Sequence, residues 1–114
     1  MDELLERLKS EGCDVDGSMD RFLNDKEFYI SCFKEVLNDP AFKQLGEALN
    51  NKNTKEAFDA AHTLKGIILN LGITPLYEII VHIVEPLRVG KYDGVDRYFK
   101  KLTEERDTLK KIFI

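Results

Sequence analysis

Three residues in the middle of the sequence are spaced so that together they could carry a phosphoryl group. Lys65 and Gly66 follow His62 by three and four residues, which places all three on one side of a helix. An exposed imidazole can attack an activated phosphoryl group, and an ammonium three residues away can reach that group. Glycine inside a helix costs about 1 kcal/mol relative to alanine, so we interpret Gly66 as clearance that keeps His62 open to a bulky partner.

The helix predicted around His62 has an apolar side and an outer side. At about 100° per residue, the apolar side consists of Ala57, Ala60, Ala61, Leu64, Ile67, Ile68 and Leu71. His62 points the opposite way, flanked on the outer side by Phe58, Asp59 and Leu69. Because solvent exposure offers an apolar side chain no stabilisation, we interpret this outer side as a partner-docking surface. A packing role for Phe58 and Leu69 under the N-terminal helix, or in a dimer, is the alternative.

The sequence has no feature that would let the protein use ATP by itself. It contains no phosphate-cradling glycine loop and no evident carboxylate cluster for Mg²⁺. We therefore expect no cofactor and no metal, with the Mg²⁺ and the catalytic groups coming from a partner. The second histidine, His82, falls on a polar helix side with Glu78 and Glu85, where we interpret it as a solvated residue and not a metal ligand.

The composition predicts one folded domain over residues 1–114. Hydrophobic residues make up 43% and charged residues 33%, a balance typical of folded proteins. The net charge of -4 and the lack of a basic stripe argue against a nucleic-acid partner. No apolar run approaches the roughly 20 residues of a membrane span, and the acidic start Met1–Glu3 is unlike a secretory signal. We expect a cytoplasmic monomer, with Cys13 and Cys32 as reduced thiols.

Apolar residues at spacings of three and four predict helices along most of the chain. In the first part of the chain, the expected elements are a helix over 2–11 ended by Gly12, a loop over 13–17, a helix starting after Gly17 or Ser18, and a helix over about 25–38. Four further helices should follow: one following Pro40 to residue 49, one over 55–71, one from Pro75 to about 87, and a last one reaching about 112. The expected caps of the last three are Thr54, Thr74 and Asp93. Pro86 should kink or loosen the end of its helix. Short connections between long helices favour an all-α, up-and-down antiparallel four-helix bundle with an additional N-terminal helix or helices.

The segment around His62 resembles the motif of histidine-containing phosphotransfer (HPt) domains. The matching residues are AHTLKG at 61–66 and NLG at 70–72. The segment MDRFLNDKEFY at 19–29 is similar to the family's N-terminal part, and VEPLR at 84–88 is similar to its later helix, so the resemblance extends over nearly the whole chain. Two positions depart from the family: Ile68 stands where a small residue is usual, and Pro86 interrupts a helix that usually continues.

The resemblance implies a four-helix bundle and a phosphorelay carrier. His62 would be the phosphoacceptor, Lys65 the charge partner and Gly66 the clearance residue. The partners would be response-regulator receiver domains, a hybrid histidine kinase, or both, and the carrier would not itself be an enzyme. One alternative is a binding module of the same fold that only sequesters a receiver or kinase. The other is a bundle enzyme or metal carrier, which would need inward carboxylate and histidine ligands that the apolar stripe does not provide.

Overall fold

The protein is all-helical in the computed structural model, which describes residues 1–114 in full. Its elements in chain order are α1 (Asp2–Ser10), α2 (Val15–Met19), the 3₁₀ helix η1 (Asp20–Phe22), α3 (Lys26–Leu37), α4 (Pro40–Asn50), α5 (Thr54–Asn70), α6 (Thr74–Arg88), α7 (Val95–Lys110) and the 3₁₀ helix η2 (Lys111–Phe113). The prediction of an all-α chain is confirmed.

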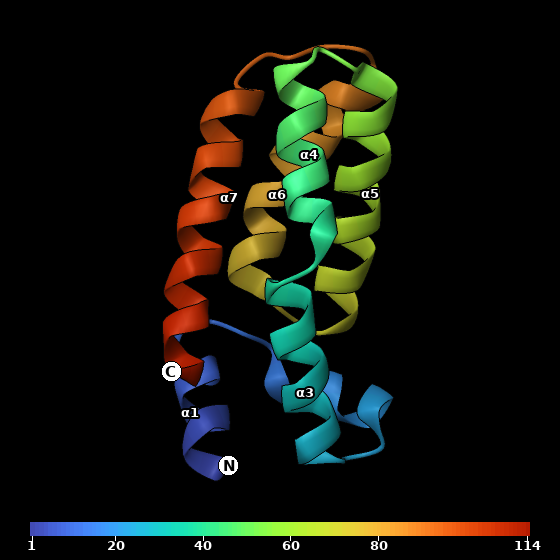
Figure 1. The fold of residues 1–114 in the computed structure, drawn as a ribbon. Helices are drawn as coiled ribbons and strands as arrows, with labels where there is room; N and C mark the ends of the chain where they lie inside the picture. The colour runs from blue at the N-terminus through green and yellow to red at the C-terminus, as the bar shows by residue number, and fades with distance from the viewer.

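The last four α-helices lie side by side and form a helical bundle (Figure 1). The most extensive contacts are between α4 and α5, between α5 and α6, and between α6 and α7. Figure 1 shows the α4–α5 and α6–α7 connections at one end of the bundle and the α5–α6 connection at the other. Each helix turns an apolar side inward, and the side chains that are completely buried there include Leu45, Leu64, Ile68, Ile80, Ile83 and Leu102. Ile68, the departure from the family pattern, is thus a core residue.

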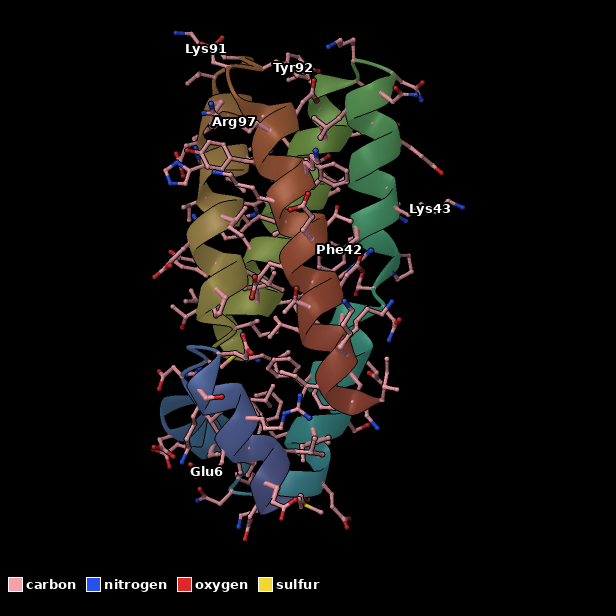
Figure 2. The ribbon with its side chains drawn as sticks, turned by 90° about the vertical axis from the view of Figure 1, so that its left-hand side faces the viewer. Glu6, Phe42, Lys43, Lys91, Tyr92 and Arg97 are labelled. Carbon is pink, nitrogen blue, oxygen red and sulfur yellow. The ribbon has the colours of Figure 1, made fainter.

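Residues 1–37 form an N-terminal segment at one end of the bundle. Figure 2 shows α1, marked by Glu6, at the end opposite to Lys91 and Tyr92 in the α6–α7 connection. The rings of Tyr29 and Phe33 on α3 are fully buried and meet edge to face, with centroids 5.9 Å apart. Both chain termini lie at this end (Figure 1), where α1 contacts η2. The segment therefore shares the hydrophobic core of the bundle.

The N-terminal segment also supplies hydrogen-bond donors to the end of α5. The last carbonyls of a helix have no partner within it and must find donors elsewhere. The donors here are Arg21 Nη2 to Leu69 O (3.5 Å), Arg21 Nε to Asn70 O (2.9 Å), Tyr29 Oη to Leu71 O (2.7 Å) and Asp14 N to Gly72 O (2.8 Å). The helix that carries His62 is thus fixed at its C-terminal end by the N-terminal segment.

Gly72 ends α5, as predicted, and the structure requires glycine there. Its φ is +67°, a conformation that side-chain-bearing residues rarely adopt. A Cβ at this position would also collide with the Ser18 hydroxyl and the Asp14 backbone carbonyl. Gly72 is therefore both a helix stop and the contact point for the start of α2.

The loop predicted over 13–17 is wrong, because α2 already begins at Val15 and not after Gly17 or Ser18. The Asp14 side chain caps it by accepting from the Gly17 amide at 3.1 Å. Pro86 lies inside α6, which continues to Arg88, and the kink or loosening expected there stays a prediction. Proline lacks the amide donor, but it sits in the last turn, where its loss affects a single bond.

The three predicted threonine and aspartate caps are wrong by one residue each. Asn53 caps α5 by accepting from the Glu56 amide at 3.2 Å, and the Thr54 hydroxyl instead lies 2.7 Å from the Tyr92 hydroxyl. Ile73 precedes α6 without a side-chain cap, and Gly94, with φ of +72°, takes the capping position of α7 in place of Asp93. The last α-helix ends at Lys110, and η2 completes the stretch predicted to reach residue 112.

Candidate functional site

Helix α5 presents His62 to solvent while anchoring itself in the core. Ala57, Ala61, Leu64 and Ile68 are completely buried on one side of α5, and His62 is exposed on the other. This is the arrangement that the apolar stripe predicts. The imidazole is thus carried by a helix that is anchored in the core, and it is exposed to solvent.

The His62 ring is stacked on the ring of Phe58, one helical turn earlier. The two ring centroids are 5.5 Å apart and the planes differ by 25°. Phe58 is half-buried and packs against the core, and the guanidinium carbon of Arg88 lies 5.2 Å from the centroid of its ring. Arg88 belongs to α6, so the neighbourhood of His62 is built by two helices.

Lys65 forms an ion pair across the same two helices. Its Nζ lies 3.8 Å from Oε1 of Glu85, and the other carboxylate oxygen of Glu85 accepts from Nε of Arg88 at 3.3 Å. The Lys65 side chain is only 23% exposed. Glu85 therefore interacts with two cations, Lys65 and Arg88, next to the exposed face of α5 that carries His62.

The surface at Gly66 is bare. A Cβ built there would meet no atom within 4 Å, so no neighbour within the protein explains the glycine. A helix interior normally favours alanine over glycine by about 1 kcal/mol. Packing within the fold is thereby excluded as the reason for Gly66, and the clearance interpretation stays a prediction.

The remaining predicted partner-binding residues lie on this surface but differ in their contacts. Asp59 pairs with Lys55, one turn earlier, at 2.8 Å, and this hydrogen bond raises the pKa of the Lys55 ammonium. Asp59 also lines a shallow groove of about 430 Å³ between α4 and α5, together with Ala41, Gln44, Glu56, Ala60 and Thr63. Leu69 is 54% exposed and is the large apolar side chain freest to meet a partner on α5.

Glu85 and Arg88 belong to the site but are not among the site residues that the sequence predicts. The sequence places Glu85 beside His82, and both Glu85 and Arg88 lie in the segment 84–88 that resembles the later helix of HPt domains. Counted from the turn at residues 71–73, residues 85 and 88 of α6 would fall beside residues near 59 and 56 of α5. This register approximates the contact of Arg88 with Phe58 but does not predict the ion pair of Glu85 with Lys65.

His82 belongs to a different surface. It is exposed, and its ring stacks on that of Tyr98 of α7, with centroids 4.6 Å apart and planes 14° apart. No set of three or more His, Cys, Asp or Glu side chains is arranged to hold a metal ion. Cys13 and Cys32 are both free thiols.

None of the helices combines the length and the apolar character needed to cross a membrane. Comparisons with protein-family models, with curated proteins and with solved structures found no match to this chain.

Proposed function

We propose that this protein is a histidine-containing phosphotransfer domain that carries a phosphoryl group on His62 between receiver domains in a cytoplasmic phosphorelay. The observation that carries the proposal is the combination on one face of α5: an exposed imidazole, a bare glycine surface one turn later, and a lysine held nearby by Glu85. In this proposal α4–α7 are the family's up-and-down antiparallel four-helix bundle, and residues 1–37 are its N-terminal addition.

The proposed reaction is a reversible transfer between an aspartate and a histidine. A nitrogen of the His62 ring attacks the phosphorus of a receiver's aspartyl phosphate, an N–P bond forms, and the O–P bond to the aspartate breaks to release the carboxylate. The same steps in reverse deliver the group to the aspartate of a second receiver. Phosphoryl transfer depends on positioning and on neutralising charge, and in this proposal the receiver supplies Mg²⁺ and the remaining catalytic groups.

Lys65 contributes charge and Gly66 contributes space. The phosphoryl group brings additional negative charge to a protein whose net charge is already -4, so a nearby ammonium lowers the cost of holding it. A receiver must bring its aspartyl phosphate into line with the imidazole nitrogen, which requires close approach of two folded domains. The missing side chain at position 66 provides room for that approach.

The test is phosphoryl transfer from a panel of receiver domains carrying labelled aspartyl phosphate. We expect the wild type and His82→Gln to become labelled, and we expect His62→Gln to stay unlabelled while remaining folded. The label should be acid-labile and base-stable, as a phosphoramidate is. Binding of a receiver without any labelling would contradict the carrier function and favour the sequestering module. Equal labelling of His62→Gln would exclude His62 as the acceptor.

A further inference from the structure

The contact between Phe58 and His62 assigns Phe58 a role other than partner docking. Phe58 is half-buried, its ring stacks on the imidazole, and Arg88 lies over its ring at 5.2 Å. Leu69, by contrast, is 54% exposed. A ring with two such neighbours has less free apolar surface to offer a partner. Its contacts are directed toward the histidine.

The orientation of the imidazole plane matters for its chemistry. The torsion that turns a histidine ring about its Cβ–Cγ bond has broad energy wells, so an exposed ring without neighbours adopts many planes. The lone pair of the attacking nitrogen lies in the ring plane, and the phosphorus must approach along that direction for in-line displacement. Restricting the plane therefore restricts the line of attack, which is a form of positioning that speeds transfer.

Stacking suits this role because it leaves the ring nitrogens free. Phe58 covers a face of the imidazole, whereas both nitrogens lie on the ring edge. Aromatic pairs of this kind add stability beyond the area they bury, enough to favour one ring plane several-fold. The reactive edge remains open to a partner.

Arg88 and Glu85 hold Phe58 from the neighbouring helix. The Arg88 guanidinium interacts with the Phe58 ring, and its Nε donates to Glu85 at 3.3 Å. Glu85 in turn pairs with Lys65. The contacts thus connect the ring that stacks on the nucleophile with the proposed charge partner.

We infer that Phe58 is a positioning residue that sets the plane of the His62 imidazole, with Arg88 holding Phe58 in place for this task. The inference rests on the proposed function for its kinetic consequence. Its structural part, a restricted imidazole beside an aromatic ring, is independent of phosphoryl transfer. The two parts are therefore tested by separate measurements.

The structural measurement is NMR of the imidazole protons in the wild type, Phe58→Leu and Phe58→Tyr. His62→Gln and His82→Gln assign the two histidines. We expect the Phe58 ring current to displace the His62 signals, the displacement to disappear in Phe58→Leu, and Phe58→Tyr to restore it. Phe28→Leu, a change at an exposed aromatic residue of α3, should leave the His62 signals in place. His62 signals that are identical in the wild type and Phe58→Leu would overturn the inference.

The kinetic measurement uses the receiver domain that labels the wild type best. We expect Phe58→Leu to lower the transfer rate at saturating phosphorylated receiver by about tenfold and to leave the half-saturating concentration unchanged. Phe58→Tyr should transfer nearly as fast as the wild type, and Arg88→Gln should show a smaller fall. A raised half-saturating concentration with an unchanged saturated rate would show that Phe58 is a docking contact and would overturn the inference. If no receiver labels the wild type, the proposed function fails, and the NMR result still decides whether Phe58 orients the ring.

Discussion

The carboxylate of Glu85 lies 3.8 Å from the Lys65 ammonium, so the cation proposed to meet the phosphoryl group already has a partner. A phosphoryl group on His62 would compete with Glu85 for Lys65. Glu85 also accepts a hydrogen bond from Arg88, which leaves its charge partly compensated when Lys65 moves away. Lys65, Arg88 and Glu85 thus carry one net positive charge together before any transfer.

Glu85→Gln should shift the phosphoryl equilibrium toward His62. Removing the competing charge frees Lys65, and exposed ion pairs are worth about 0.2–1 kcal/mol, so we expect a shift of about 1.4- to fivefold. The measurement is the distribution of label between a receiver and this protein at equilibrium. Glu78→Gln, an exposed change on the same helix, is the control and should have no effect. A shift toward the receiver would contradict the assigned role of Glu85.

Substitution of Gly66 by alanine should raise the stability of the fold and lower the rate of phosphoryl transfer. Gly66→Ala adds a methyl group where nothing lies within 4 Å, so we expect it to stabilise the fold by up to about 1 kcal/mol. The same variant should transfer more slowly, and Gly66→Gln more slowly still, because each side chain fills the clearance. Thermal unfolding and receiver-dependent labelling measure the two effects, with Glu56→Ala as a control on α5. Gly66→Gln transferring at the wild-type rate would refute the clearance role.

Gly72→Ala should destabilise the protein far more than Gly90→Ala. Both glycines have positive φ, +67° and +73°, and each substitution costs about 1–2 kcal/mol from the backbone conformation alone. At Gly90 a Cβ meets nothing, whereas at Gly72 it collides with the start of α2. We expect Gly72→Ala to cost about 3 kcal/mol or more, measured by urea unfolding. Equal losses for the two variants would mean that the contact with α2 carries no stability.

The buried thiol of Cys13 should make the protein less stable at high pH. Burial raises the pKa of Cys13 from 9.0 to about 12. Because the folded state binds this proton more tightly than the unfolded state, the contribution to stability is complete below pH 9 and is lost as the pH rises toward 12. We expect the free energy of unfolding to fall over that range.

The control for this pH dependence is a pair of cysteine variants. Cys13→Ala should have a shallower decline between pH 9 and 10, because a thiol exposed by unfolding ionises from a pKa of 9.0, whereas Tyr29, whose pKa burial also raises, ionises in the unfolded state from 10.0. Cys32→Ala should change the slope less, because Cys32 is only half-buried. Identical slopes for the wild type and Cys13→Ala would exclude Cys13 as the titrating group.

The sequence predicts most of the helices because their ends have local causes. Gly12, Gly72 and the Asp39-Pro40 pair stop or start helices through backbone preferences that act whatever the rest of the fold does. The start of α2 is predicted less well: the helix is expected after Gly17 or Ser18 and begins at Val15. The helix is only five residues long, and one of the bonds at its start, from Asp14 N to Gly72 O, reaches a residue far along the chain that no local pattern reveals.

The same distinction applies to the site. The outward direction of His62 follows from the apolar stripe of α5, because burial of that stripe leaves one orientation for the helix. The contacts of Glu85 and Arg88 depend on how far α6 is rotated and shifted against α5, which is set by the packing of both helices with α4 and α7. The stack of Phe58 on His62 depends in addition on side-chain rotamers. The periodicity of apolar residues in the sequence determines neither the α5–α6 contacts nor the Phe58–His62 stack.

Phe58, His62, Lys65, Glu85 and Arg88 all come from the hairpin of α5 and α6. Their mutual contacts join only α5 and α6, and the other elements support this hairpin. The five residues therefore form a contact network within one continuous segment of the chain. This segment could be transplanted into another helical scaffold, provided that the host supplies apolar side chains to pack against the inner faces of α5 and α6. The host would also have to supply hydrogen-bond donors for the carbonyls at the C-terminal end of α5.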